Sequence, residues 1–161
     1  MQVAVTGAAG LLGRAAVPLL LEAGHAVIAL GRDPVRLREV LGAGPRCRVT
    51  SYEEGDLAEA MAGCGAVAHL AARRVAPAGE GEAAFAGPNL DLSRRVLRAA
   101  SASGVGAVVL ASSVSVYSPV NALPYSEEEV PVPSGPYGRS KLAAERLALA
   151  WATGTGGREV G

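Results

Sequence analysis

Three evenly spaced glycines after a short apolar run constrain this chain more than any other feature. The run Val3–Val5 ends at Thr6, and the glycines follow at Gly7, Gly10 and Gly13, with an apolar helical pattern beginning after the second of them. A strand, a glycine turn and a helix in this order bring backbone N–H groups to a helix N-terminus, where an anion such as a pyrophosphate is stabilised. We therefore predict a tight turn at Gly7, close approach of phosphates at Gly10 and close helix packing at Gly13.

Apolar runs of strand length alternate with helical patterns along the rest of the chain. This alternation predicts a parallel sheet covered by helices on both faces. The later strands are expected at 26–30, 47–51, 66–70 and 107–111, and the helices at 11–23, 34–41, 56–62, 89–103 and 137–151, with loops at 76–87 and 118–135. We predict a doubly wound α/β fold, a Rossmann domain over 1–152 with strand order 3-2-1-4-5, followed by a flexible tail over 153–161.

Several helix ends carry recognisable signals. Asp33 precedes Pro34, which is typical of an N-cap followed by a proline in the first helical position. Asp56 is expected to cap the third helix, and Gly24 to close the first one. Pro18 lies inside the first helix and removes one backbone donor, so we expect a kink there rather than a break.

Composition and charge exclude several classes of partner. The chain has 161 residues with 15 basic and 15 acidic side chains, so we expect neither a nucleic acid nor an acidic membrane as a partner. No apolar run reaches the ~18 residues of a membrane span, and the N-terminus has the pattern of a strand rather than of a signal peptide. Cys47 and Cys64 lack metal-ligand spacing. We interpret both as reduced core residues of a cytoplasmic protein and predict no metal site.

A second cluster of polar residues points to catalysis. Tyr137 and Lys141 are four residues apart in an expected helix and share a face, and Ser113 follows the fifth strand. A phenol with a pKa of about 10 is a poor base at neutral pH, but a neighbouring ammonium favours the phenolate and lowers that pKa. The serine hydroxyl can hydrogen-bond the substrate oxygen at the carbon that yields hydride. Taken alone, Tyr137 and Lys141 could be an ordinary exposed helix pair; with the glycine motif, we favour catalysis.

These motifs together resemble the extended short-chain dehydrogenase/reductase family. The similar segments are TGAAGLLG at 6–13, HLAA at 69–72, the asparagine at 89, SSVSVY at 112–117 and YGRSK at 137–141. Within that family, the NAD-dependent epimerase/dehydratase group of nucleotide-sugar enzymes is the most similar. The resemblance implies an NAD(P)-dependent oxidoreductase or epimerase that acts by hydride transfer on a small nucleotide-sugar-like molecule or another carbinol or carbonyl substrate.

The resemblance also implies a role for each matched residue. Tyr137 would be the base, Lys141 its pKa-lowering partner and ribose ligand, and Ser113, rather than Ser112, the residue that hydrogen-bonds the substrate. The implied cofactor-binding residues are Gly7, Gly10, Leu11, Leu12, Gly13, Arg32, Leu70, Ala71, Ala72, Tyr137 and Lys141.

The chain departs from the family pattern where the adenosine half of the cofactor is recognised. Members that use NAD resemble one another in placing an acid at the tip of the second strand, and here Gly31 and Arg32 stand there. A guanidinium suits a 2′-phosphate, so we favour NADP over NAD. Asp33 could still turn toward a ribose hydroxyl, and a solvated turn is the other alternative. Ser51 and Tyr52 replace the usual aspartate near the adenine, which predicts weaker or backbone-mediated adenine recognition.

A further departure concerns the type of reaction. The 4,6-dehydratases of this family carry an Asp-Glu pair directly after the catalytic hydroxyl residue. Here those positions are Val114 and Ser115, neither of which can act as an acid or base for water elimination. The sequence therefore favours epimerisation or carbonyl reduction over dehydration.

The end of the chain motivates a second hypothesis. Family members continue with further strands and a C-terminal substrate domain, whereas this sequence ends at Gly161. Without that domain we expect catalysis to suffer, because remote binding energy aligns the reacting carbon. A truncated, non-catalytic NAD(P)-binding module, acting as a sensor or partner subunit, is thus the alternative. The oligomeric state stays open, and a homodimer is one arrangement that we consider.

Overall fold

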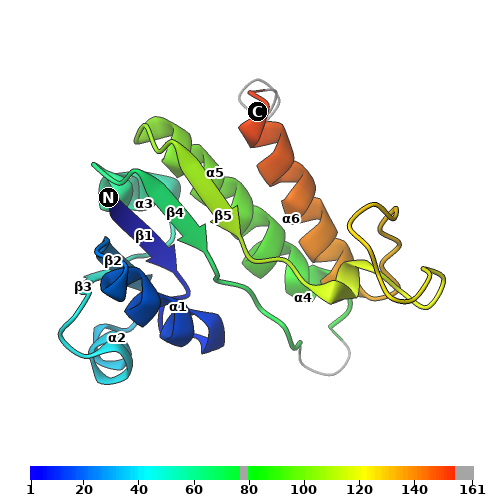
Figure 1. The fold of residues 1–161 in the computed structure, drawn as a ribbon, viewed down its shortest axis with the longest axis horizontal. Coiled ribbons are helices and arrows are strands. Elements are labelled where there is room, and N and C mark those ends of the chain that lie inside the picture. Colours follow the sequence, from blue (N-terminus) through cyan, green and yellow to red (C-terminus); the bar gives the residue numbers. More distant parts are fainter. Residues whose placement is uncertain (77–79, 155–161) are drawn as a thin grey trace. The chain divides into compact units, whose positions relative to one another are not determined.

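The computed structural model of the chain describes residues 1–76 and 80–154. Its strands form one parallel sheet in the order β3-β2-β1-β4-β5, as the sequence predicts (Figure 1). The strands are β1 (Gln2–Thr6), β2 (Ala26–Gly31), β3 (Arg46–Val49), β4 (Ala66–His69) and β5 (Ala107–Leu110). Because all the pairings are parallel, the carboxyl ends of the strands share one edge of the sheet.

The helices largely follow the predicted pattern. They are α1 (Leu11–Glu22), α2 (Pro34–Leu41), α3 (Glu54–Met61), α4 (Ala83–Phe85), α5 (Leu92–Ala102) and α6 (Pro136–Ala152), with a π-helical turn η1 (Ala86–Asp91) and a 3-10 turn η2 (Val114–Val116). Helix α1 continues through Pro18 without a break, and Gly24 follows it with φ +79°, as predicted for a helix-closing glycine. Asp33 is the N-cap of α2 and Pro34 its first residue, which confirms that prediction.

Residue contacts divide the chain into two compact units. The first comprises residues 1–71 and 95–111, and the second comprises residues 72–94 and the chain from 112 onward. The whole sheet lies in the first unit with α1, α2 and α3. Helices α4 and α6 and the turns η1 and η2 lie in the second, and the boundary between the units falls within α5.

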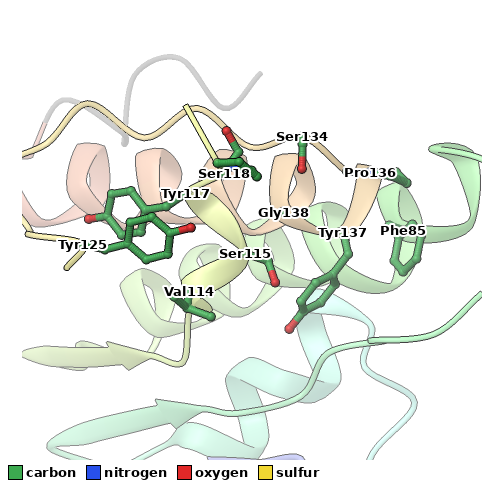
Figure 2. Close-up of a pocket in the computed structure, with 12 residues that line it drawn as sticks. Phe85, Val114, Ser115, Tyr117, Ser118, Tyr125, Ser134, Pro136, Tyr137 and Gly138 are labelled. Atoms are coloured by element: carbon green, nitrogen blue, oxygen red, sulfur yellow. The ribbon is translucent and has the colours of Figure 1, made fainter. Parts of the chain in front are cut away.

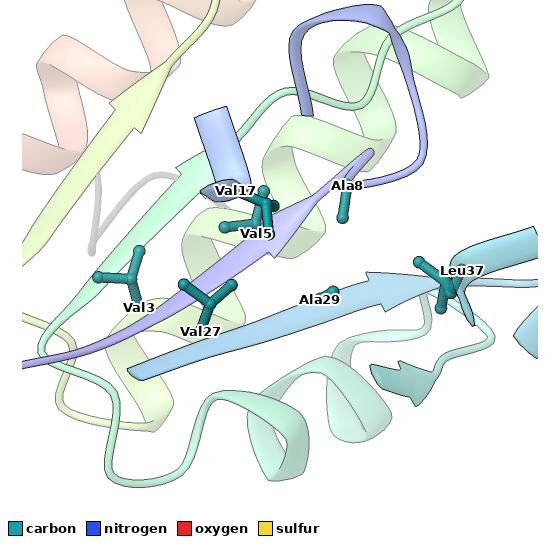
Figure 3. Close-up of a cluster of buried hydrophobic side chains, with 7 residues drawn as sticks. All are labelled: Val3, Val5, Ala8, Val17, Val27, Ala29 and Leu37. Carbon is teal, nitrogen blue, oxygen red and sulfur yellow. The ribbon is translucent and has the colours of Figure 1, made fainter. Parts of the chain in front are cut away.

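The core of the first unit is a cluster of small and branched apolar side chains on the face of the sheet that α1 and α2 cover (Figure 3). Its members are Val3, Val5, Ala8, Val17, Val27, Ala29 and Leu37. Helix α5 passes behind the same strands in Figure 3, and its residues Val96 and Ala100 are fully buried. Both faces of the sheet are thus covered, as expected for parallel strands with near-continuous apolar runs.

Asp56 does not cap α3, and this prediction was wrong. The N-cap residue of α3 is Glu53, and the Asp56 carboxylate instead accepts hydrogen bonds from Thr50 Oγ1 (2.9 Å), Ser51 N (2.6 Å) and Ser51 Oγ (2.9 Å). The Ser51 N–H, followed by the two hydroxyls, holds the pKa of Asp56 below its usual value. Asp56 therefore fixes the turn between β3 and α3, and β3 itself ends at Val49, earlier than predicted.

The segment before α5 is more ordered than its composition suggested. The sequence predicts a loop over 76–87 and a helix from Asn89, but α4 and the π-helical turn η1 precede α5. Pro88 lies within η1 and has no N–H to donate, so the regular α-helical hydrogen bonding cannot pass through this position. The wider turn accommodates the proline, and such turns are frequent at functional sites. Residues 77–79 lie outside the part that the structure describes.

Three smaller expectations concern the C-terminal tail, the cysteines and membrane-spanning helices. Of the predicted tail, residues 155–161 lie outside the described part of the structure, while Thr153 caps the C-terminus of α6 and Gly154 follows with φ +72°. Cys47 and Cys64 are both free thiols, the second of them buried. Across residues 1–76 and 80–154, no helix is long and apolar enough to cross a bilayer.

Candidate functional site

The glycine turn after β1 is built so that side chains would not fit. Gly7 has φ +68°, and a Cβ on it would lie 2.7 Å from the backbone nitrogen of Ala71. A Cβ on Gly13 would overlap the carbonyl oxygens of Gly7 and Ala8. Gly10 closes the turn, because its N–H donates to the Gly7 carbonyl at 2.9 Å. The geometry agrees with the predicted roles of Gly7 in the turn and of Gly13 in helix packing.

The N-terminus of α1 is open to a ligand. Gly10 is its N-cap residue and no side chain caps the helix, so the first backbone N–H groups lack a side-chain acceptor. Leu11 and Leu12 are 79% and 54% exposed. This is the arrangement in which a phosphate can accept from a helix N-terminus.

The end of β4 is held against the glycine turn by one threonine. Thr6 is fully buried, its carbonyl accepts from Leu70 N at 3.2 Å and its hydroxyl accepts from Ala71 N at 3.3 Å. Two of the predicted cofactor residues, Leu70 and Ala71, therefore lie beside Gly7 in the first unit. The third, Ala72, is the first residue of the second unit.

The tip of β2 presents a cation, Arg32, beside an acid that caps a helix. The Asp33 carboxylate accepts from Val35 N (2.9 Å) and Arg36 N (3.0 Å) as the cap of α2. Arg32 is exposed, and its guanidinium carbon lies 5.3 Å from the centre of the Tyr52 ring. The acid that could have turned toward a ribose hydroxyl is thus engaged in the helix cap.

In the second unit, α6 carries Tyr137 and Lys141 one turn apart. Tyr137 is half-buried, and its ring centre lies 6.0 Å from that of Phe85 in a tilted arrangement. Lys141 is only 2% exposed. Burial lowers the pKa of Lys141, and the carboxylate of Glu145 opposes this effect. Lys141 is therefore not the solvated lysine of an ordinary exposed helix pair.

Tyr137 lines a pocket of about 470 Å³ in the second unit (Figure 2). The lining residues are Phe85, Val114, Ser115, Tyr117, Ser118, Pro119, Tyr125, Ser134, Gly135, Pro136, Tyr137 and Gly138. Figure 2 shows the hydroxyl groups of Tyr137 and Ser115 pointing toward the same side, with Phe85 beside Tyr137. The pocket offers hydroxyl groups and aromatic rings, and none of its lining side chains is charged.

Ser113 lies next to this pocket but is not part of its lining. Its hydroxyl donates to Ser115 Oγ at 3.1 Å and accepts from Ser115 N at 3.1 Å, as the cap of η2. The structure thus links the predicted serine to the pocket through Ser115.

Two residues of this region had no role assigned from the sequence. Gly138 packs against η2, since a Cβ on it would overlap the Ser115 carbonyl oxygen and lie 3.0 Å from Pro133 Cβ. A glycine between Tyr137 and Lys141 was the available signal, because glycine costs a helix interior roughly 1 kcal/mol relative to alanine. It allows the turn that carries Tyr137 to approach Ser115.

The other residue is Asn89, which is 1% exposed. Its amide donates to the Arg73 carbonyl (3.0 Å) and to Ser140 Oγ (2.9 Å) and accepts from Arg73 N (2.7 Å). Ser140 in turn donates to the Tyr137 carbonyl at 2.7 Å. Asn89 therefore ties the segment after β4 to the first turn of α6. Its position in a π-helical turn depends on tertiary packing that the sequence pattern did not indicate.

The chain is similar in sequence to a family of known proteins. The family model for the "NAD dependent epimerase/dehydratase family" matches residues 3–159. UDP-glucose 4-epimerase of Corynebacterium glutamicum is 29% identical over 97% of this chain and 48% of its own length. dTDP-glucose 4,6-dehydratase of Streptomyces griseus is 35% identical over 91% of this chain and 48% of its own length.

A solved structure shows the same fold. It is that of UDP-glucose-4-epimerase from Stenotrophomonas maltophila with bound NAD and formylated UDP-arabinopyranose, which superposes with a TM-score of 0.83 at 28% identity. The superposition covers 96% of this chain and 49% of the other. The chain thus spans about half the length of the relatives that it matches.

Proposed function

Since the chain belongs to the NAD dependent epimerase/dehydratase family, we propose that it uses NAD(P) for hydride transfer at a carbinol or carbonyl carbon, as an epimerase or a reductase. The observation that carries this proposal is the pairing of Tyr137, which lines a pocket, with Lys141, which is buried one helical turn away. A lysine side chain is rarely buried without a functional or structural reason.

The glycine turn supports a dinucleotide as the cofactor. Gly7 and Gly13 leave no room for side chains, and the uncapped N-terminus of α1 offers backbone N–H groups for a pyrophosphate. The residues that would hold the cofactor in the first unit are Gly7, Gly10, Leu11, Leu12, Gly13, Arg32, Leu70 and Ala71, with Ala72 following in the second. When bound, the nicotinamide supplies or accepts hydride. The solved relative with bound NAD supports the same class of cofactor.

We further propose NADP as the preferred form. Arg32 is an exposed cation at the tip of β2, where a guanidinium suits a 2′-phosphate. Asp33 caps α2 because its Oδ1 accepts from Val35 N and from Arg36 N. Turning this carboxylate toward a ribose hydroxyl would cost that cap, which is typically worth about 1 kcal/mol.

Tyr137 is the proposed base and Lys141 its electrostatic partner and a ribose ligand. The Tyr137 phenolate would accept the proton of a carbinol as that carbon loses hydride. In the reverse direction, the Tyr137 hydroxyl would give its proton to a carbonyl oxygen as that carbon gains hydride. Burial makes the Lys141 ammonium costly by itself. A phenolate at Tyr137, one helical turn away, would offset that cost. Ser113 is the proposed hydrogen-bond donor to the substrate oxygen, with Ser115 beside it.

Dehydration is not proposed, although dehydratases are among the relatives. Val114 and Ser115 occupy the positions directly after Ser113. Neither a valine nor a serine is a suitable acid or base for eliminating water at neutral pH.

The experiment that tests this function compares the wild-type chain with the Tyr137→Phe variant. NADPH and NADH are titrated by fluorescence, and interconversion of UDP-glucose and UDP-galactose and oxidation of NADPH by carbonyl compounds are followed in parallel. We expect Tyr137→Phe to retain dinucleotide binding and to lose turnover by roughly 100-fold or more. Unchanged turnover would remove Tyr137 as the base, binding without turnover in the wild type would favour a non-catalytic module, and no binding at millimolar concentration would refute the proposal.

A further inference from the structure

Tyr52 has an unusual backbone for a large residue. Among the described residues it is the sole non-glycine residue with positive φ, at +64°, a conformation that is an outlier for bulky side chains. It directly follows the turn after β3, and its side chain is buried, with 6% of the residue exposed. Such conformations persist where the surrounding contacts determine them, and they are frequent at ligand sites.

Tyr52 is held by hydrogen bonds at its backbone and at its phenol hydroxyl. Its backbone N–H donates to Thr50 Oγ1 at 3.0 Å, and Thr50 Oγ1 itself donates to the Asp56 carboxylate. At the other end, the phenol hydroxyl donates to the Leu30 carbonyl at 3.1 Å. Burial raises the pKa of Tyr52, an effect that the Gly7 backbone N–H and the Arg32 charge oppose. The ring therefore lies across the carboxyl end of β2, close to the glycine turn, in a fixed position.

The guanidinium of Arg32 lies against this ring. The Arg32 guanidinium lies 5.3 Å from the ring centre, within the distance at which a cation is attracted to an aromatic face. Within residues 1–76 and 80–154, Arg32 takes part in no ion pair, and the adjacent carboxylate of Asp33 is engaged in the α2 cap. The guanidinium is thus positioned by Tyr52 while its N–H donors remain available to a ligand.

We propose that Tyr52 is a positioning residue that selects the phosphorylated dinucleotide by holding Arg32 at the tip of β2. The inference rests on the proposed dinucleotide function. A guanidinium that is already ordered loses less side-chain entropy when it binds a phosphate, so the ring favours ligands that carry a 2′-phosphate and leaves the others unaffected. An exposed cation–π contact of ordinary strength corresponds to about a two- to fivefold preference.

The test measures the dissociation constants of NADPH and NADH by fluorescence titration for the full chain and four variants. In Tyr52→Met, which fills much of the same volume without a ring, we expect the affinity for NADPH relative to that for NADH to fall about two- to fivefold. Tyr52→Phe keeps the ring and should keep the wild-type ratio of the two constants. Arg32→Ala should abolish the preference, and adding Tyr52→Met to it should cause no further change in the ratio.

Several results would overturn the inference. Equal weakening of NADPH and NADH in Tyr52→Met would show that the ring serves only the local packing. Loss of the preference in Tyr52→Phe would assign the effect to the hydroxyl instead of the ring, and this variant remains informative if Tyr52→Met does not fold. A wild-type chain that prefers NADH would refute the inference alone, whereas one that binds neither dinucleotide would refute the proposed function.

Discussion

At the scale of single residues, the burial of Lys141 is the feature of the candidate site that affects a charged group most. A lysine four residues after a tyrosine on a helix is common, and its usual position is on the solvated surface. Here the lysine is 2% exposed, and burial lowers its pKa. Burying an ammonium group costs free energy, so the position of Lys141 should reduce the stability of the folded chain.

We expect Lys141→Met to raise the free energy of unfolding at pH 7, by about 1 kcal/mol. The folded-state pKa of Lys141 is lowered, so the unfolded chain binds the additional proton and the wild type gains stability as the pH rises from the folded value toward about 10.4. The advantage of the variant should therefore shrink between pH 7 and pH 10. Urea unfolding of the variant and the wild type at both pH values measures this difference in the free energy of unfolding.

The matched control for this prediction is Arg146→Met. Arg146 is exposed on the same helix, so its replacement should change the free energy of unfolding by less than about 0.5 kcal/mol at either pH. If Lys141→Met is less stable than the wild type at pH 7, the cost assigned to the buried ammonium is wrong.

At the scale of elements, the contact between β1 and α1 determines the geometry of the glycine turn. The helix can start immediately after the turn because Gly13 brings its backbone against the carbonyls of Gly7 and Ala8. The sequence predicted this contact well, because the pattern of strand, glycines and helix is entirely local. Of the two N-caps predicted at aspartates, one was confirmed and one was wrong. Asp33 caps α2, whereas the Asp56 carboxylate accepts hydrogen bonds from Thr50 and Ser51. A carboxylate near a helix start has two sets of donors within reach, and only the path of the preceding strand decides between them.

Gly13→Ala should lower the free energy of unfolding by about 1–3 kcal/mol, because the new methyl group overlaps two carbonyl oxygens. Gly55→Ala is the matched control, since Gly55 lies in α3 with open space around it and the change should stabilise the helix by up to about 1 kcal/mol. Urea unfolding of both variants gives the comparison. Equal stability of Gly13→Ala and the wild type would contradict the packing role.

At the scale of the whole molecule, each of two compact units carries its own set of proposed functional residues. The first unit contains the sheet and the glycine turn, and the second contains Ser113, Tyr137 and Lys141 with the pocket. The proposed functions are divided in the same way, with phosphate binding in the first unit and proton transfer in the second.

A saturating dinucleotide should stabilise the chain if the glycine turn binds it. At a concentration 100-fold above its dissociation constant, NADPH should add about 2.7 kcal/mol to the free energy of unfolding. For a chain of this size that corresponds to an increase of roughly 5–10 °C in Tm. Thermal unfolding followed by circular dichroism measures the shift, with inorganic phosphate at matched ionic strength as the control. A Tm that does not respond to NADPH would argue against binding.

From the sequence alone, the alternation of strands and helices predicted the order of the sheet. Local patterns predicted the glycine turn and the placement of Tyr137 and Lys141 one helical turn apart. Tertiary structure decided the rest. The burial of Lys141, the hydrogen bonds of Asn89, the packing of Gly138 against Ser115 and the contact of Arg32 with Tyr52 all join segments far apart in the chain. Such contacts depend on how the elements pack, and no pattern within one segment specifies them.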